Sequence, residues 1–285
     1  MKALHRAALL SVLLVGLSTL LVAQQPAAQQ TAAVVQPALT PEQIEQFLLK
    51  AKIVATKGVS KGINNTRRAT LTDGSITHDA QIQTVDISKF VFVPARGPAE
   101  VNFRDSYRYN IAGYQLARLL GVANVPVSVE RQIQRTPAAV TWWIDDVLMD
   151  EAGRRKNTAP GWVATRTNAQ IHIMRVFDEL IANTDRNLGN LLWTTDGTMW
   201  MIDHTRAFRL QKTLKNPALL QRCERGLLEG MRSLSLENLK KAMGEALTEP
   251  EIEALLARRD LIVTLFEDKI AQRAESAVIY TLDPP

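Results

Sequence analysis

A dense polar segment from Asn183 to Asn190 (NTDRNLGN) constrains the fold of this chain more than any other feature. It follows a stretch, Asn168–Ile181, in which apolar residues recur at the spacing of one helix face, so we expect a helix there. It is the densest polar segment of the chain, and a short strand is expected directly after it. The segment is therefore the first candidate for a functional loop.

A short hairpin is expected directly after this loop. Leu191–Trp193 and Met199–Ile202 have the pattern of strands, and the Thr-Asp-Gly turn at residues 195–197 separates them. A hairpin brings its two ends side by side, so Asn190, before the first strand, and Asp203, after the second, are expected to lie together.

The residue types in this loop and hairpin suit phosphoryl transfer. That reaction uses an acidic group to orient an acceptor hydroxyl, and an amide and a carboxylate to hold a divalent metal against phosphates. Asp185, Asn190 and Asp203 supply these groups in that order.

Two other interpretations of the loop remain open. Its Asn and Asp residues are also typical of a capped turn. Asp185, Asn187 and Gly189 alternate as ligands of a calcium loop do, with Asp196 in the twelfth place. However, such a loop needs glycine in the sixth place and glutamate in the twelfth.

The remaining elements predict an α+β fold with a small β-rich N-lobe, about 41–140, and a mainly helical C-lobe, about 141–285. Thr40 is expected to cap a helix that starts at Pro41. Asp73-Gly74 is expected to turn a hairpin. The expected strands are 67–72, 75–85, 125–129 and 141–147, the expected helices 105–120, 217–231, 236–245 and 248–275, and the expected connections 94–104 and 150–160.

These motifs resemble an atypical kinase group that includes phosphoinositide kinases, HipA toxin kinases and secretory-pathway casein kinases. The resemblance covers about residues 54–210 and is most specific over 177–208. The group's catalytic loop has an Asp-Arg-x-x-x-Asn pattern and its metal-binding strand ends in Ile-Asp, as Asp185–Asn190 and Ile202-Asp203 do here. The resemblance implies a bilobal protein kinase-like fold, with Asp185 as catalytic base and Asn190 and Asp203 as metal ligands.

This chain departs from the group at its phosphate-binding ion pair. Gln83 stands where the resemblance implies a lysine, and Asn110 where it implies the glutamate that holds this lysine. Two amides can hydrogen-bond to each other, but they bring no charge to a phosphate. Lys57, Lys61 and Lys89 are candidate substitutes.

Three further residues are candidates for nucleotide contact. Gly58 and Gly62 bound a loop whose backbone amides can cradle phosphate, although a plain turn explains them equally well. Arg186 can contact phosphate or form an internal salt bridge.

The amino terminus has the pattern of an export signal. Lys2 and Arg6 precede an apolar run from Ala7 to Ala23, which predicts a signal peptide over residues 1–23. Residues 24–40 are uncharged and predict a flexible linker. We expect a periplasmic or secreted protein, contacting a membrane only if the apolar run stays uncleaved as an anchor.

Charge and cysteine content exclude some classes of protein. The net charge of +5 includes Lys2 and Arg6, and no block of five basic residues exists, so we expect no nucleic-acid partner. The single cysteine, Cys223, excludes an intramolecular disulfide and a cysteine-rich zinc site.

The sequence thus predicts an exported atypical kinase-like protein that binds ATP or another nucleotide with Mg²⁺ or Mn²⁺. Its acceptor would be a hydroxyl group of a protein or a small molecule. The alternative is a pseudokinase that acts as a ligand-binding or scaffold module. The Gln83 and Asn110 pair favours this alternative, whereas the catalytic loop favours the enzyme.

Overall fold

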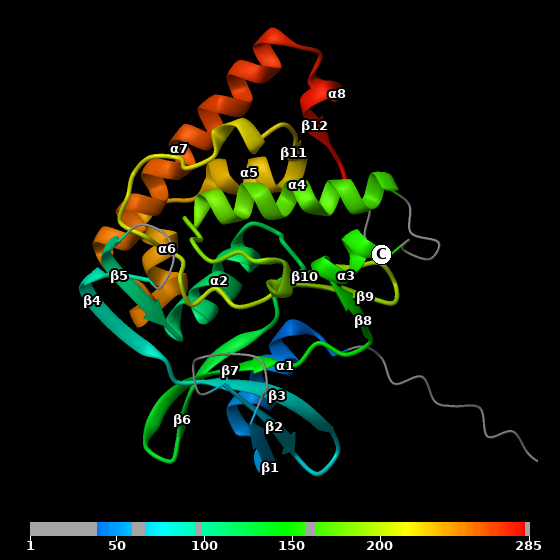
Figure 1. Ribbon diagram of the computed structural model, residues 1–285, viewed down its shortest axis with the longest axis vertical. Helices are drawn as coiled ribbons and strands as arrows, with labels where there is room; N and C mark the ends of the chain where they lie inside the picture. The colour runs from blue at the N-terminus through cyan, green and yellow to red at the C-terminus, as the bar shows by residue number, and fades with distance from the viewer. Residues whose placement is uncertain (1–38, 59–65, 95–98, 158–163, 283–285) are drawn as a thin grey trace, which may run out of the picture. The chain divides into compact units, whose positions relative to one another are not determined.

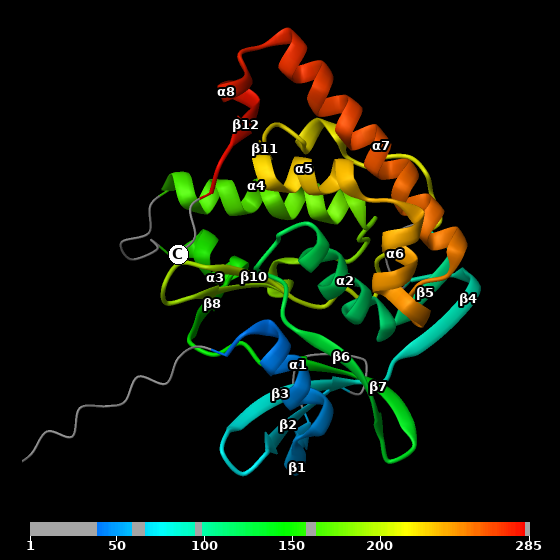
Figure 2. The same cartoon turned by 180° about the vertical axis from the view of Figure 1, so that it is seen from behind.

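The computed structural model describes residues 39–58, 66–94, 99–157 and 164–282 of the chain. The chain divides into two units, and the second, Leu39–Pro285, contains all of these residues. The predicted signal peptide, the predicted linker up to residue 38, Gly62 and Lys61 lie outside the described residues. The predicted α+β class is confirmed: a β-rich part precedes a helical part (Figures 1 and 2).

A five-stranded antiparallel sheet forms the β-rich part. Its strand order is β1-β2-β3-β7-β6, and helix α1 packs against β6 and β7 (Figure 1). As predicted, Thr40 caps α1, and Gly74 turns the β2–β3 hairpin with a φ of 96°, a conformation that glycine adopts readily. The elements are α1 (Pro41–Lys50), β1 (Lys52–Gly58), β2 (Arg67–Thr72), β3 (Thr77–Gln83), β6 (Ser128–Ile133) and β7 (Thr136–Trp142).

A separate hairpin includes residues that the sequence predicted to be a connection. The predicted connection 94–104 contains the start of β5 (Glu100–Ser106), which pairs with β4 (Asp86–Phe92). Helix α2 (Arg108–Leu119) consequently begins later than predicted, because Asp105 and Ser106 belong to β5. Pro94, Gly97 and Pro98 suggested a connection in the sequence, but the pairing of β4 with β5 extends to Phe92 and Glu100.

The segment between the sheet and helix α4 also differs from the prediction. Strand β7 ends at Trp142 and not at Val147, and the predicted loop 150–160 contains a short helix, α3 (Glu151–Lys156). Asp150 caps this helix by accepting the backbone N–H of Gly153. Strand β8 (Val147–Asp150) joins β9 (Leu191–Thr194) and β10 (Met199–Met201) in a three-stranded sheet, so the predicted hairpin is confirmed and gains a third strand.

The carboxyl-terminal part is helical, with one further correction. The predicted helix 217–231 begins instead with a 3-10 turn and a short strand, β11, which pairs in parallel with β12 near the chain end. Figure 2 shows α5 on the far side of α4 from the five-stranded sheet, and α7 running past α5 toward α6, which lies beside α2. These elements are α4 (Ala164–Leu180), η1 (Leu188–Asn190), η2 (Pro217–Leu219), β11 (Cys223–Glu224), α5 (Arg225–Ser233), α6 (Leu236–Met243), η3 (Gly244–Ala246), α7 (Glu249–Gln272), α8 (Glu275–Val278) and β12 (Ile279–Tyr280).

One continuous hydrophobic core extends from the sheet into the helices. It includes Leu48 of α1, Phe177 of α4 and Phe266 of α7, all of them buried. Cys223 is buried in the same core. No helix in the described ranges is long and apolar enough to cross a membrane.

Candidate functional site

The polar loop follows directly after helix α4. Ala182, just past the helix, has a φ of 47°, a conformation that a non-glycine residue adopts only where surrounding contacts hold it. Asn183 uses both ends of its amide here: Nδ2 donates to Asp178, and Oδ1 accepts the backbone N–H of Asp185 at 3.0 Å. The loop conformation before Asp185 is thus set by side chains as well as by the backbone.

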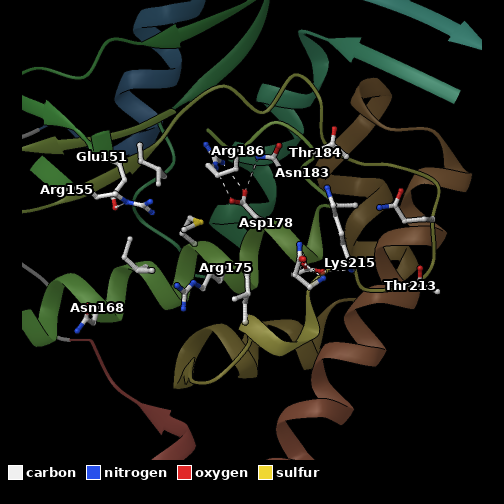
Figure 3. A pocket seen from close by; sticks show the side chains of 18 of the residues that line it. Glu151, Arg155, Asn168, Arg175, Asp178, Asn183, Thr184, Arg186, Thr213 and Lys215 are labelled. Atoms are coloured by element: carbon white, nitrogen blue, oxygen red, sulfur yellow. Dashed lines mark hydrogen bonds and ion pairs between the residues drawn. The ribbon is translucent and has the colours of Figure 1, made fainter. Parts of the chain in front are cut away.

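Arg186 holds the loop in place through hydrogen bonds to α4 and to the backbone. Its guanidinium forms two hydrogen bonds with Asp178 of α4, at 2.9 and 3.0 Å, as Figure 3 shows. Its Nη1 also donates to the carbonyl oxygens of Asn190 and Ile202, at 3.0 and 2.7 Å. Because all three nitrogens of the guanidinium are engaged within the protein, we assign Arg186 a positioning role and not the nucleotide contact suggested from the sequence.

The predicted meeting of Asn190 and Asp203 is visible in the backbone. The N–H of Ile202 donates to the carbonyl oxygen of Asn190 at 3.1 Å, which places Asn190 beside the residue before Asp203. Asn190 Nδ2 donates to the carbonyl oxygen of Asp185 at 3.2 Å. Asp185, Asn190 and Asp203 therefore belong to one cluster, as the sequence predicted.

The Asp203 carboxylate is buried near other negative charges, and few hydrogen bonds offset this. Burial raises the pKa of its carboxyl above the ordinary 3.8, and the negative charges of Asp105 and Asp185 raise this pKa further. Thr205 opposes the shift through hydrogen bonds that include Oγ1 to Asp203 Oδ1 at 3.1 Å. Asp203 also has a φ of 57°. Such strain and such a shift are found together at functional sites more than elsewhere.

These residues fit a divalent metal. Asn190 Nδ2 is engaged with Asp185, so its Oδ1 is the amide atom that can ligate, next to the poorly compensated carboxylate of Asp203. The described residues contain no group of three or more His, Cys, Asp or Glu arranged to hold a metal. An amide oxygen and a carboxylate are the kinds of donor that Mg²⁺ and Mn²⁺ accept, and these ions need few protein ligands when phosphate oxygens complete the shell.

The Asp185 carboxylate lies at the outer side of the cluster. Arg206 Nη1 lies 3.7 Å from Oδ1, and the Asp185 side chain is 44% exposed. Arg206 is held in turn by Glu100 of β5 at 2.6 Å. Thr184 ties the loop to the same segment by donating Oγ1 to the Arg206 carbonyl oxygen.

The two amides that replace the expected ion pair meet as predicted. Asn110 Nδ2 of α2 donates to Gln83 Oε1 of β3, and both side chains are buried. Asn110 Oδ1 accepts the backbone N–H of His204 at 2.8 Å, so the pair is connected to the residue after Asp203. Burial holds the pKa of His204 well below 6.5, and Arg186 adds to this effect, so the imidazole is neutral and structural.

The remaining candidates lie elsewhere. Gly58 ends β1, and its partner in the predicted cradle, Gly62, is outside the described residues. Lys57 is an exposed residue of β1, and Lys89 of β4 lies over the Phe92 ring. Neither lysine lines the cleft described next.

A cleft of about 520 Å³ joins the sheet to this cluster. Thr66, Gln81 and Gln83 line it from the sheet, and Asn190 and Asp203 line it from the hairpin. The segment 141–147, which leads from β7 to β8, forms its third side and contributes Trp142 and Trp143. The predicted metal ligands thus lie at one end of a cavity large enough for a small-molecule ligand.

A second cavity, of about 500 Å³, runs along α4. Figure 3 shows Arg175, Asn183, Thr184 and Lys215 at its wall. Neither Asp185 nor Asp203 lines it. Arg186 does line it, so this cavity borders the polar loop on the side of α4.

The sequence analysis missed Asp178 and Thr205. Asp178 lies in the last turn of α4, where a negative charge opposes the helix dipole, and this unfavourable placement indicates a tertiary partner. The calcium-loop interpretation is wrong in this structure. Asn187 caps the one-turn helix η1, and Asp196 hydrogen-bonds to Thr194 and Thr198 in the hairpin turn.

Comparison with known proteins bears on the fold. No protein-family model and no curated protein matches the sequence. The solved structure of hydra Fam20 with sugar matches over 84% of this chain and 92% of that one, with a TM-score of 0.64 and 16% identity. A Golgi casein kinase structure matches over 86% of this chain and 79% of that one, with a TM-score of 0.58 and 13% identity.

The chain has an atypical kinase-like fold. This confirms the bilobal architecture implied by the resemblance in sequence. In the atypical kinase-like fold, the five-stranded sheet is the small lobe, the helical part is the large lobe, and the cleft of 520 Å³ lies where they meet.

Proposed function

We propose that this protein binds a nucleotide, such as ATP, with Mg²⁺ or Mn²⁺ in the cleft and transfers a phosphoryl group to a hydroxyl acceptor. The observation that carries the proposal is the hydrogen bond from Ile202 N–H to the Asn190 carbonyl oxygen. This bond holds the two proposed metal ligands together at the end of the cleft, with Asp185 attached through Asn190 Nδ2.

Each residue of the cluster has a definite task in this proposal. Asn190 Oδ1 and the Asp203 carboxylate would hold the metal, which neutralises phosphate charge when bound. Asp185 would accept the proton of the acceptor hydroxyl as its oxygen bonds to the γ-phosphorus, while the bond from that phosphorus to the bridging oxygen breaks and ADP leaves. Its partial exposure leaves the carboxylate reachable, while Arg206 orients it from 3.7 Å.

The acceptor has a place to approach. A cavity of about 560 Å³ opens beside Thr184 and Arg206, the residues that adjoin and contact Asp185. It is separate in its lining from the cleft that we assign to the nucleotide. We propose that the acceptor binds there, because Thr184 precedes Asp185 and Arg206 lies 3.7 Å from its carboxylate.

We also propose that the protein acts outside the cytoplasm, through the predicted signal peptide 1–23 or, uncleaved, as an anchored form. One of the proteins with a similar structure is described as a Golgi casein kinase. We retain the predicted lobe boundaries, about 41–140 and 141–285, as part of this proposal.

A second candidate function is a nucleotide-binding module without transferase activity. The observation that favours it is the neutral Asn110–Gln83 hydrogen bond at the position where the resemblance implies a charged pair. Without that charge, the phosphates lose a source of orientation that transfer normally uses.

One experiment separates the two candidates. Thermal unfolding of the purified full-length chain is measured with ATP and Mg²⁺ or Mn²⁺, and ADP release and autophosphorylation are measured in parallel. Asp203→Asn and Asp185→Asn test the site, and Asp268→Asn, an exposed residue of α7, is the control.

We expect metal-dependent stabilisation of the wild type, Asp185→Asn and the control, but not of Asp203→Asn. Phosphate transfer is expected only for the wild type and the control. If the wild type is stabilised but transfers no phosphate, the transferase is contradicted and the binding module is supported. If the wild type shows no metal-dependent stabilisation, both candidates are contradicted.

A further inference from the structure

A further cavity, of about 680 Å³, shares one wall with the cleft that we assign to the nucleotide. The shared wall is the segment 142–146 together with Pro126. The rest of the lining differs: it comes from the start of α1, the loop 121–127 after α2 and the β9–β10 hairpin, and it includes Trp200. We call this space the Trp200 cavity, because Trp200 lines it and does not line the cleft.

Tryptophan rings are concentrated in the described lining of the Trp200 cavity. It contains three of the five tryptophans of the chain, Trp142, Trp143 and Trp200. The His78 ring stacks on Trp142 with ring centres 3.4 Å apart, and the Arg68 guanidinium lies 4.2 Å from the centre of the Trp143 ring. Among the described residues, Trp200 has neither a cation nor another ring against it. Its ring is therefore the one left for a ligand.

Strand β10 and the loop after α2 hold Trp200 at the cavity wall. Met199 and Met201, on either side of it, are completely buried, and side chains alternate along a strand, so Trp200 faces away from that core. Asn124 fixes the strand around it, since Nδ2 donates to the Met199 carbonyl oxygen at 2.7 Å and the Asn124 carbonyl oxygen accepts the Met201 N–H at 2.9 Å. The indole is consequently held half-buried beside the cavity.

The described lining of the Trp200 cavity has a net negative charge. Its charged residues are three aspartates and one arginine, namely Asp145, Asp146, Asp196 and Arg118. Arg118 is already paired with two carboxylates outside the lining, those of Glu42 and Glu45. Residues 24–38, which precede Leu39 of the lining in the chain, contain no charged residue and so add no cation.

Two of the three aspartates have partners. Asp145 Oδ2 lies 2.6 Å from His78 Nε2. Asp196 accepts the Thr198 hydroxyl at 2.9 Å within the hairpin turn. The Asp146 side chain forms no hydrogen bond or ion pair with the part of the chain that the structure describes. Asp146 is thus the carboxylate whose charge a ligand can meet.

The backbone brings Asp146 to the hairpin that carries Trp200. The N–H of Thr195 donates to the Asp146 carbonyl oxygen at 3.0 Å, which places Asp146 against the turn that leads into β10. Val122 and Val125 of the loop after α2 line the same cavity. The cavity therefore combines an aromatic face, a carboxylate and apolar walls.

We propose that the Trp200 cavity binds a small organic cation, an ammonium group with an apolar body, whose charge lies over the Trp200 ring and near Asp146. The negative face of an indole attracts a cation, and the nearby carboxylate adds to this attraction. The apolar walls accept the body of the ligand. No group of three or more His, Cys, Asp or Glu in the described ranges could hold a metal ion instead. This site does not depend on the proposed nucleotide site.

The test uses a matched pair of probes in calorimetric titrations of the full-length protein at pH 7. Phenylethylamine is protonated at this pH, and phenylethanol has a similar shape without the charge. We expect the amine to bind about tenfold more tightly than the alcohol. The ratio of the two affinities is the quantity compared between variants, because a loss of structure or of apolar contact weakens both probes together.

Variants assign the ratio to residues. Trp200→Leu keeps an apolar side chain without the aromatic face, and Asp146→Asn removes the charge while tolerating the φ of 53° at this position. We expect each to lower the ratio to about threefold or less, and Trp200→Phe to give an intermediate ratio. Asp268→Asn, which removes one negative charge from an exposed position of α7, is the control and should leave the ratio unchanged.

Three results would overturn this proposal: equal affinity of the wild type for the two probes, no binding of either probe, or an unchanged ratio in Trp200→Leu. The last result would place the cation in the nucleotide cleft, which Trp142 and Trp143 also line. An unchanged ratio in Asp146→Asn alone would overturn the role given to this carboxylate. None of these measurements uses a nucleotide or a metal, so their outcome is independent of the proposed function.

Discussion

Arg186 and Asp178 form a bidentate ion pair next to the loop that carries Asp185, with Nε to Oδ2 at 2.9 Å and Nη2 to Oδ1 at 3.0 Å. Their side chains are only 10% and 12% exposed, so water screens the pair little. Through its Nη1, Arg186 also holds the backbone at Asn190 and Ile202. The geometry of the proposed metal site therefore depends on an ion pair that contacts neither metal nor nucleotide.

Asp178→Asn should destabilise the protein and weaken metal-dependent nucleotide binding. The asparagine leaves the Arg186 charge without a counter-ion and turns a donor toward its guanidinium, which we expect to reduce the free energy of unfolding by about 3 kcal/mol. Urea unfolding measures this change. Glu267→Gln, which removes the exposed ion pair with Arg232, is the control and should cost less than about 1 kcal/mol. Equal losses in both variants would contradict the role given to Asp178.

Asp203→Asn should stabilise the metal-free protein while abolishing its response to metal and nucleotide. Because the pKa of Asp203 is raised, the folded state holds this proton more tightly than the unfolded state. Ionisation of Asp203 therefore lowers stability as pH rises above 3.8, and the full loss is present above the raised pKa. An asparagine side chain does not ionise, so the variant does not lose this stability, and asparagine tolerates the φ of 57° at this position.

The expected gain for Asp203→Asn is about 1 kcal/mol at pH 7 in EDTA, shrinking as the pH falls toward 3.8. Thermal unfolding at several pH values measures it. A variant less stable than the wild type in EDTA at pH 7 would show that the carboxylate is well compensated without a metal.

Glu151→Gln should destabilise the protein in a pH-dependent way. Burial raises the pKa of Glu151, but hydrogen bonds from Arg154, Arg155 and Trp193 outweigh it and hold the pKa at about 2. The stabilisation is complete above the ordinary value of 4.5 and is lost as the pH falls toward 2. We expect a loss of about 3 kcal/mol at pH 7 in the variant.

The difference between wild type and Glu151→Gln should narrow as the pH falls below 4.5, as measured by urea unfolding at pH 7, 5, 4 and 3. Glu245→Gln, at an exposed position, should follow the wild type throughout. A difference that does not change with pH would mean that packing, not charge, accounts for the role of Glu151.

Arg258→Met should loosen the segment that follows the proposed metal site. Arg258 is fully buried, and it donates to the carbonyl oxygens of Leu180, Arg209 and Gln211. Methionine leaves these oxygens without their donors, which we expect to cost about 3 kcal/mol.

Hydrogen exchange should locate this change at residues 209–211 and at the end of α4. Arg273→Met, at an exposed position just past α7, should change stability by less than about 0.5 kcal/mol. Unchanged exchange at residues 209–211 in Arg258→Met would contradict the anchoring role.

Much of the candidate site could be predicted because its signals are local. The Asp185–Asn190 loop, the hairpin and Asp203 follow one another within about twenty residues, and a hairpin determines by itself which ends meet. The helix cap at Thr40 and the hairpin turn at Asp73-Gly74 were equally predictable, since a cap and a tight turn depend only on neighbouring residues.

Other features could not be predicted because they join distant segments. Strand β5 was missed because pairing with β4 overrides the local signal of its proline and glycine neighbours. Arg258 belongs to a long helix with many charged residues, yet packing of α7 on α4 buries it completely. No local pattern states which face of a long charged helix a neighbouring helix will cover.

The sequence by itself determined the order of the chemistry: Asp185, then Asn190, then Asp203 at the end of a hairpin. Its physical basis is that turns, caps and hairpins act over a few residues. Only the tertiary structure decided that Arg186 binds Asp178, that Asn110 donates to Gln83 at the cleft, and that the charged residues in the described lining of that cleft are acidic. These relationships depend on which surfaces of the sheet and the helices pack together, and burial is what gives their charges and hydrogen bonds their strength.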